Sequence, residues 1–241
     1  MKEKLRQIYV ERQFNPQWLG IFINPFFLAR RGLRRAIEAR KGYLYGKMLD
    51  VGCGSKPYRA LFAVDDYVGL EIDTPQTRAR GIADVWYDGK KFPFGDESFD
   101  SVLCNQVLEH IFTPDEFLRE IHRVLKPGGH LLLTVPFVWD EHEQPYDYAR
   151  YSSFGLRALL EKNNFVVREH EKILNDASVL FQLLIAYLYK IIGIRDVKFS
   201  LLLSVVLFAP ISLAGWCAGV LLPKNNDLFL DQIILAERHR S

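Results

Sequence analysis

The stretch from Met48 to Tyr58, an apolar run that ends in an aspartate and a glycine turn, is the strongest constraint on how this chain can fold. The apolar run predicts a buried β-strand. Gly52 and Gly54 predict a tight turn at which a ligand can approach the main chain closely, and we expect N–H groups of the turn to face a nucleotide-like ligand. Pro57 occupies the third glycine position of the dinucleotide pattern G-x-G-x-x-G, which disfavours a nicotinamide site. The glycines alone fit an ordinary strand-to-helix turn equally well.

A second short apolar run, Tyr67–Asp73, follows the turn and carries Glu71 near its carboxyl end, where an adenosine ribose would present its hydroxyls. With this run included, the sequence resembles the class I S-adenosylmethionine-dependent methyltransferases, in particular the type 11 group. The resemblance extends from Lys47 to Val167 and rests on segments in the family's order. These are Leu49–Gly54, Val68–Glu71, Phe92–Phe94 with Ser98–Asp100, Asn105–His110 and Leu125–Gly129.

The resemblance implies S-adenosyl-L-methionine as cofactor. It implies that an acid four residues before the Phe-Pro-Phe element, Asp88, holds the adenine amino group, with Asp84 as a weaker alternative. Main-chain carbonyls of Asn105 and Gln106 are candidates to receive the methionine amino group. The cofactor-binding residues predicted in this way are Asp50, Gly52, Cys53, Gly54, Glu71, Asp88, Asn105 and Gln106.

The alternation of strand and helix patterns predicts an α/β fold, a Rossmann-like, doubly wound and mostly parallel sheet. Thr113–Glu116 has the pattern of a helix capping box, with a proline at the first helical position. The family usually closes its sheet with an antiparallel seventh strand, for which the candidate here is Leu228–Glu237. We expect a helical N-terminal segment over residues 1–44 and a methyltransferase domain over 45–241, interrupted by an apolar helical insertion at 175–224.

The segment Phe137–Tyr151 follows the apolar run His130–Val135, which predicts the fifth strand. The segment is crowded with aromatic and titratable groups, so it is the predicted wall of the acceptor site. Methyl transfer to a hydroxyl or amine needs a base, and His142 is the first candidate because histidine titrates near neutrality. It could equally be a surface histidine. His110 is the second candidate, since the adjacent Glu109 could orient it and raise its basicity.

A metal site is not expected from the sequence. The acids and histidine of the same segment lack a recognised ligand spacing. This set comprises Glu141, His142, Glu143 and Asp147. The three cysteines have no regular spacing and suit a reducing compartment.

The first 41 residues carry ten Lys or Arg against three acids, a balance of +7 within an overall charge of +2. Basic residues from Arg30 to Lys41 follow the aromatic run Trp18–Leu28, a composition typical of membrane surfaces. A solvated helix that caps the catalytic domain is the alternative, and nucleic-acid binding is not favoured because the aromatics are clustered. No secretory signal is visible at the N-terminus, so we expect a cytoplasmic enzyme at the inner face of a membrane.

Phe199–Leu222 is 24 residues without a charge, and Ser178–Ile194 is a shorter apolar run. Both lie between strands of one domain, which requires an even number of crossings. We expect a re-entrant or interfacial hairpin, bent at Pro210 and loosened at Gly215 and Gly219. Two full spans, or a helical pair buried in the core or in a homodimer interface, are the alternatives.

Three functions remain open on the sequence. The first is a methyltransferase acting on an unknown, amphipathic acceptor such as a lipid or lipid-linked sugar. The second is a catalytically silent adenosylmethionine-binding membrane adaptor, and the third a nicotinamide-dependent oxidoreductase.

Overall fold

The computed structural model describes residues 13–14, 16–80, 82–193 and 196–239. The chain divides into two compact units. One, the helical unit, comprises residues 1–36, 138–140 and 172–231, and the other, the catalytic unit, comprises residues 37–137, 141–171 and 232–241. The sequence Gly81–Asp88 predicts a third strand, and its first residue, Gly81, lies outside the described residues.

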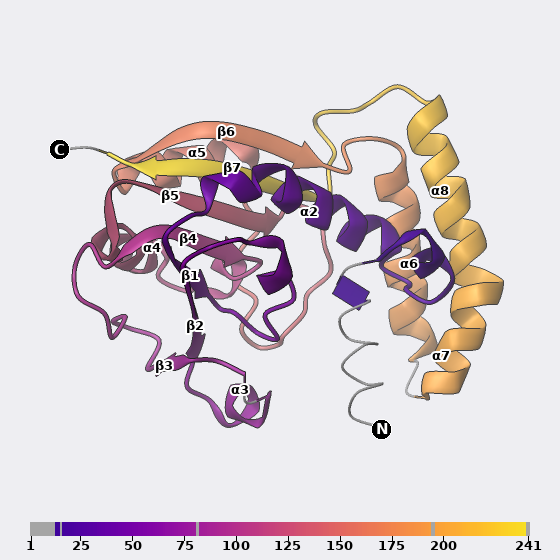
Figure 1. Cartoon of the computed structure of the whole chain (residues 1–241). Helices are drawn as coiled ribbons and strands as arrows, with labels where there is room; N and C mark the ends of the chain where they lie inside the picture. The colour runs from indigo at the N-terminus through magenta and orange to yellow at the C-terminus, as the bar shows by residue number, and fades with distance from the viewer. Residues whose placement is uncertain (1–12, 15, 81, 194–195, 240–241) are drawn as a thin grey trace. The chain divides into compact units, whose positions relative to one another are not determined.

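A seven-stranded sheet has the order β3-β2-β1-β4-β5-β7-β6. The pairs β1·β2, β1·β4, β2·β3 and β4·β5 are parallel, whereas the arrows of β6 and β7 point in opposite directions in Figure 1. The predicted α/β fold with a mostly parallel, doubly wound sheet is therefore confirmed. The strands are β1 Lys47–Val51, β2 Asp66–Ile72, β3 Val85–Tyr87, β4 Phe99–Asn105, β5 Leu125–Pro136, β6 Phe165–Ile173 and β7 Asp231–Arg238.

The chain reverses its direction of travel across the sheet between β1 and β4. Val51, the last residue of β1, pairs with Leu70 on one side and with Cys104 on the other. The carboxyl ends of β1, β2 and β4 therefore meet at one edge. Ligands of open parallel sheets bind at such a switch point.

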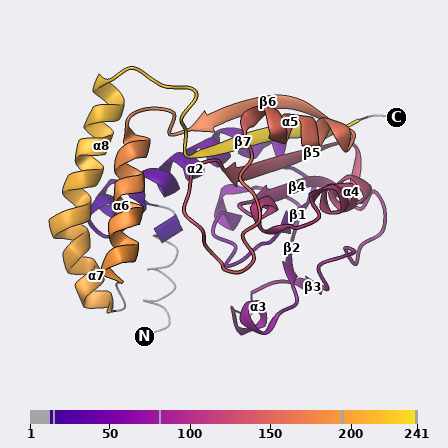
Figure 2. The same cartoon turned by 180° about the vertical axis from the view of Figure 1, so that it is seen from behind.

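Two helices, α4 (Pro114–Val124) and α5 (Ser153–Lys162), lie on the same face of the sheet (Figure 2). Their apolar faces join the core of the catalytic unit. In α4 this face includes Phe117, Leu118 and Ile121, whose spacing in the sequence predicts one side of a helix. The predicted capping box is wrong in one respect. Thr113 makes no side-chain capping bond; its carbonyl oxygen, 3.1 Å from the N–H of Glu116, accepts instead. Ser152 does cap α5, through a 3.1 Å bond from the Gly155 N–H to its hydroxyl.

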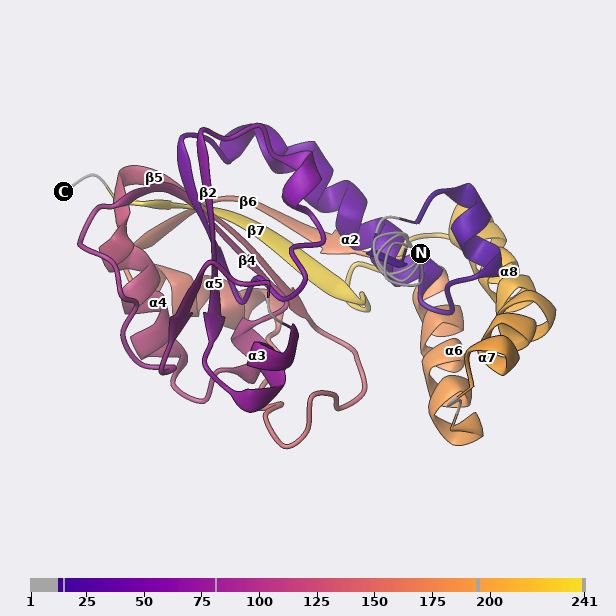
Figure 3. The same ribbon diagram turned by 60° about the horizontal axis from the view of Figure 1, so that its bottom comes forward.

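The predicted apolar insertion is a helical hairpin, with α6 running beside α7 and α8 (Figure 3). Its bounds are α6 Ser178–Ile192, α7 Val197–Leu203, a π-helical turn Ser204–Phe208 and α8 Ala209–Leu221. The irregularity in the second helix is this π turn, just before Pro210.

Gly215 and Gly219 do not loosen α8. A methyl group on Gly215 would lie 2.7 Å from Phe181 Cβ, and one on Gly219 would lie 2.6 Å from an oxygen of Asp176. These glycines let α8 pack closely within the helical unit, which is the opposite of the role predicted for them.

The basic segment forms a 3-10 turn, Trp18–Phe22, the helix α2 (Phe27–Arg40) and a second 3-10 turn, Lys41–Tyr43. Within the helical unit, the guanidinium of Arg31 lies 3.9 Å from the ring centre of Trp18. Within the catalytic unit, Arg40 is buried and pairs with Glu169 at 3.0 Å and Glu171 at 2.9 Å. Arg40 therefore stabilises the fold and is not exposed to a partner.

The remaining short helices are η3 Arg59–Leu61, α3 Pro75–Arg80 and η4 Leu108–His110.

Candidate active site

The glycine turn after β1 is held against the end of β2. The N–H groups of Gly52 and Cys53 both donate to the carbonyl oxygen of Leu70, at 2.9 and 3.1 Å, and the N–H of Gly54 donates to Glu71 Oε2 at 2.9 Å. The expectation that these N–H groups face a ligand is therefore wrong, because the neighbouring strand uses them. What the turn offers a ligand is close approach to its backbone.

Gly54 provides that approach. It has φ of +49°, and a carbon added to it would meet no atom within 4 Å. Gly52 has φ of +67°, but a carbon added there would lie 2.4 Å from Val107, which follows β4. Gly52 therefore keeps the β1 turn and the β4 exit in contact, whereas Gly54 borders open space.

The acids predicted to hold adenosine differ in their surroundings. Glu71 lies at the carboxyl end of β2, and besides Gly54 its carboxylate accepts from the Ile72 N–H at 3.1 Å. Asp88 is exposed just after β3, where it accepts from the Lys90 N–H at 3.0 Å. Asp84 accepts from Gly69 and from the Lys56 ammonium, both at 2.7 Å. Asp84 thus links β2 to the glycine turn through these two bonds. Asp88 remains the candidate to bind the adenine amino group.

Asp50 and Cys53 point into the protein. Asp50 is 5% exposed and accepts a short hydrogen bond from the Tyr67 hydroxyl. Burial raises the pKa of Asp50 to about 7, against the opposing effect of the bond from Tyr67. Cys53 is buried, and burial raises the pKa of its thiol to about 12. Their side chains therefore support the turn, and contact of these residues with the cofactor stays a prediction.

Asn105 and Gln106 turn the chain sharply at the end of β4. Gln106 has φ of +55°, a left-handed conformation that is rare outside glycine. Thr134 of β5 fixes this turn, because its hydroxyl donates to Asn105 Oδ1 at 2.8 Å and its carbonyl accepts from the Gln106 N–H at 3.0 Å. The main chain at Asn105 and Gln106 therefore lies at the switch point, and its role toward the methionine amino group stays a prediction.

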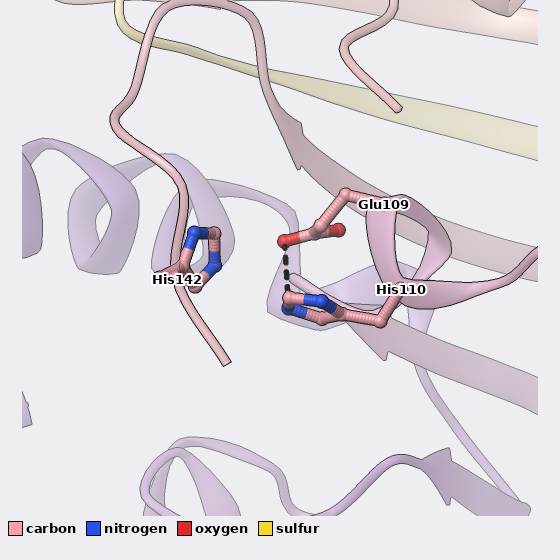
Figure 4. Close-up of side chains that lie close together, drawn as sticks. All are labelled: Glu109, His110 and His142. Atoms are coloured by element: carbon pink, nitrogen blue, oxygen red, sulfur yellow. Dashed lines mark ion pairs between the residues drawn. The ribbon is translucent and has the colours of Figure 1, made fainter. Parts of the chain in front are cut away.

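His110 and His142, predicted as alternatives, lie side by side. Their ring centres are 4.8 Å apart, and Glu109 Oε1 points toward both rings (Figure 4). His110 Nε2 is 3.8 Å from Glu109 Oε1, and Glu109 is fully buried. Burial lowers the pKa of His110, although the hydrogen bond from its ring to the Tyr146 carbonyl opposes this. The expected rise in the basicity of His110 is therefore wrong.

The loop that carries His142 is fixed to the exit of β4. The carbonyl oxygen of Glu109 accepts from the N–H groups of Tyr148 and Ala149, at 2.9 and 3.2 Å. Asp147 Oδ2 accepts from the His142 N–H at 2.9 Å, and Arg150 binds both oxygens of this carboxylate, at 2.6 and 2.7 Å. The hydrogen bonds from Arg150 hold the pKa of Asp147 well below its usual range. His142 is thus a positioned side chain and not a loose surface histidine.

The sequence pattern did not indicate two residues of the site. Val107 contacts the turn at Gly52, and Thr134 holds the turn at Gln106. Both are ordinary core residue types in the sequence, and only the pairing of β4 with β1 and β5 gives them this role. The signal that could have indicated Thr134 is a lone hydroxyl in the apolar run of β5.

Comparisons with known proteins support the fold and the methyltransferase activity. Residues 49–133 match the family model of the methyltransferase domain. A stretch of 101 residues, 38% of this chain and 37% of the relative, is 36% identical to an uncharacterized methyltransferase of Mycobacterium leprae. The chain spans about half or less of the length of the first curated relatives it matches.

Solved structures show the same fold at low identity. A crystal structure of the [4+2]-cyclase SpnF has a TM-score of 0.58 at 21% identity, covering 89% of this chain and 84% of that one. Phosphoethanolamine N-methyltransferase 2 of Haemonchus contortus, in complex with S-adenosyl-L-methionine, has a TM-score of 0.53 at 18% identity, covering 86% of this chain and 52% of that one. The match over residues 49–133 and the relative named as a methyltransferase support a class I S-adenosylmethionine-dependent methyltransferase, and the solved structures show the same fold.

Proposed function

We propose that this chain transfers a methyl group from S-adenosylmethionine to an acceptor seated beside His110 and His142. The observation that carries the proposal is the meeting of three chain segments at the switch point of the sheet: the turn at Gly54, the carboxylate of Glu71 and the turn at Gln106.

The residues at this edge fit the cofactor. The open space beside Gly54 admits a ligand against the backbone, and Glu71 supplies a carboxylate at the position where a ribose is bound in such sheets. Asp88 would receive the adenine amino group, and the main chain at Asn105 and Gln106 the methionine amino group. When bound, S-adenosylmethionine supplies a methyl group on a positively charged sulfur.

The protein's task is then to align the acceptor with that methyl carbon and to receive the acceptor's proton. The Nδ1 of His110 donates to the Tyr146 carbonyl at 2.7 Å, so in the neutral ring Nε2 carries the lone pair. Because burial lowers the pKa of His110, the ring is neutral at physiological pH and can accept a proton. His142, held by Asp147, is the second group able to do so.

The first test is cofactor affinity measured by titration calorimetry. Gly54→Ala places a methyl group in the open space, and Glu71→Ala removes a hydrogen-bond acceptor of charge-assisted strength. We expect Glu71→Ala to lower affinity about 10- to 100-fold, from a loss of roughly 1.5–3 kcal/mol. Gly193→Ala is the matched control, because Gly193 has φ of +62° and equally open surroundings but ends α6 in the helical unit. Unchanged affinity in both site variants would contradict the assignment.

We infer that the acceptor is amphipathic and is met at the inner face of a membrane. Phe199–Leu221 is long and apolar enough to cross a membrane, and 28% of its most apolar window is buried within the protein. An exposed apolar surface of this extent marks an interaction site. At 15 residues, α6 is about 22 Å long, shorter than a hydrocarbon core of about 30 Å. These lengths favour interfacial insertion over two full spans.

The acceptor class is tested by incubating the full chain with adenosylmethionine labelled in the methyl group and a cell lysate. Label in the lipid or lipid-linked sugar fraction supports the proposal. Cofactor binding without label in any fraction would instead identify a silent binding protein. That outcome is a real alternative, because a relative of this fold is described as a cyclase, so the fold by itself does not dictate methyl transfer.

A further inference from the structure

Three side chains that metal ions favour converge beside the switch point. One carboxylate oxygen of Glu109 and one ring nitrogen each of His110 and His142 all lie within 4.8 Å of one another. Glu109 is fully buried, and the two rings are partly buried. Glu109 and His110 come from the exit of β4 and His142 from the loop after β5, so the group is built by the tertiary fold.

The ring of His110 has the tautomer that a metal ligand requires. A backbone carbonyl can only accept, so the 2.7 Å contact between His110 Nδ1 and the Tyr146 oxygen places the proton on Nδ1. The lone pair is then on Nε2, which is 3.8 Å from Glu109 Oε1. Two ligands of one ion at about 2.1 Å each stand roughly 3–3.5 Å apart. The two atoms would need to approach by only a few tenths of an ångström.

His142 is oriented in a comparable way. Its Nδ1 is 3.3 Å from Asp147 Oδ2, and Arg150 holds that carboxylate through two short contacts. Metal-binding histidines almost always direct their other ring nitrogen to a backbone carbonyl or a carboxylate, which fixes the ring and strengthens the ligand. His110 uses a carbonyl for this purpose and His142 uses a carboxylate.

We propose that Glu109, His110 and His142 bind one divalent transition-metal ion, of the Zn²⁺, Co²⁺ or Mn²⁺ class. Two imidazoles and one carboxylate suit these ions better than Mg²⁺ or Ca²⁺, which prefer oxygen ligands. Three protein ligands leave coordination positions for water or for an oxygen of the acceptor. The role in catalysis rests on the proposed function, whereas binding of the ion does not. With an ion bound, the two histidines would be ligands and not bases; the ion would lower the pKa of an acceptor hydroxyl that coordinates it, and the proton would be released to solvent.

The test is ion binding by the untagged full-length chain without cofactor or acceptor. After removal of metal with a chelator, the protein is titrated with Co²⁺ and Zn²⁺, followed by the visible absorption of Co²⁺ and by calorimetry. We expect one ion per chain, with the affinity lowered at least 100-fold in Glu109→Gln, His110→Ala and His142→Ala. Asp147→Asn, which weakens both the support of His142 and the pair with Arg150, should lower affinity about 10- to 100-fold.

His239→Ala is the control, because this histidine is exposed and follows β7. Circular dichroism of each variant verifies that it is folded, and Glu109→Gln keeps the shape of the buried side chain. The proposal is overturned if the wild-type chain binds no stoichiometric ion, or if folded variants of all three ligands bind it as well as wild type. A failure of methyl transfer with ion binding intact would overturn the proposed function alone.

Discussion

Buried polar side chains around the glycine turn decide how the site is shaped. The buried Asp50 accepts a hydrogen bond from the partly buried Tyr67, and the N–H of Gly54 donates to Glu71. Because these bonds are made within the protein, the turn does not have to be ordered by its ligand. A binding site that is ordered in advance loses less conformational entropy on binding.

The raised pKa of Asp50 makes stability depend on pH. The carboxyl keeps its proton up to about pH 7 in the folded chain but loses it near pH 4 when unfolded. The stabilisation is therefore complete below pH 4 and is lost as the pH rises through 7, by at most about 4 kcal/mol. Asp50→Asn removes this titration and still accepts from Tyr67. We expect urea denaturation to show the variant gaining stability relative to wild type between pH 4.5 and pH 8.

A second variant, Tyr67→Phe, tests the same titration of Asp50. Tyr67→Phe removes the hydrogen bond that opposes the rise in the Asp50 pKa, so its loss of stability over this range should be at least as steep as that of wild type. Parallel pH profiles for wild type and Asp50→Asn would mean that Asp50 is ionised in the folded chain.

The helices α4 and α5 differ in how they begin, although a hydroxyl residue, Thr113 or Ser152, precedes each of them. In α5 the Ser152 hydroxyl accepts from Gly155, whereas in α4 the Thr113 hydroxyl makes no such bond and Pro114 occupies the first position without needing an acceptor. The cap of α5 matters because Leu156 and Leu160 of that helix are fully buried in the core.

Removing the two hydroxyls should therefore have unequal effects. We expect Ser152→Ala to lower the free energy of unfolding by about 1 kcal/mol and Thr113→Ala to change it by less than about 0.5 kcal/mol. Chemical denaturation of both variants measures the difference. Equal losses would indicate that Thr113 caps α4 in solution.

The molecule as a whole combines a methyltransferase sheet with a helical unit that displays apolar side chains. Val206 is 65% exposed, Val220 68% and Leu221 80%, all on the second arm of the hairpin. Isolated apolar residues on a surface are ordinary, but one helical unit rarely exposes so many unless a membrane or another protein covers them.

Charges placed on this surface should weaken membrane binding without unfolding the chain. We expect Val206→Glu with Val220→Glu to lower cosedimentation with uncharged phosphatidylcholine vesicles several-fold, because a charge resists transfer into the lipid interface. Phe154→Glu is the matched control, since Phe154 is 83% exposed in the catalytic unit. If wild type does not sediment, or the double variant sediments equally, the membrane proposal fails. A change in molecular mass by light scattering would then point to a homodimer through the same surface.

The sequence by itself determined the sheet class, the glycine turn after β1, the strand ends that carry Glu71 and Asn105, and the buried face of α4. These features are encoded by local periodicity and by turn residues, which act over a few positions of the chain. They were predictable because they do not depend on contacts with residues that are distant in sequence.

Only the tertiary structure decided which groups meet. It placed His110 beside His142, paired Arg40 with two glutamates of β6, turned the N–H groups of Gly52 and Cys53 back to Leu70, and packed α8 closely at its glycines. Each of these contacts joins residues far apart in sequence. Their geometry is fixed by strand order and helix packing, which a local pattern of residues does not encode.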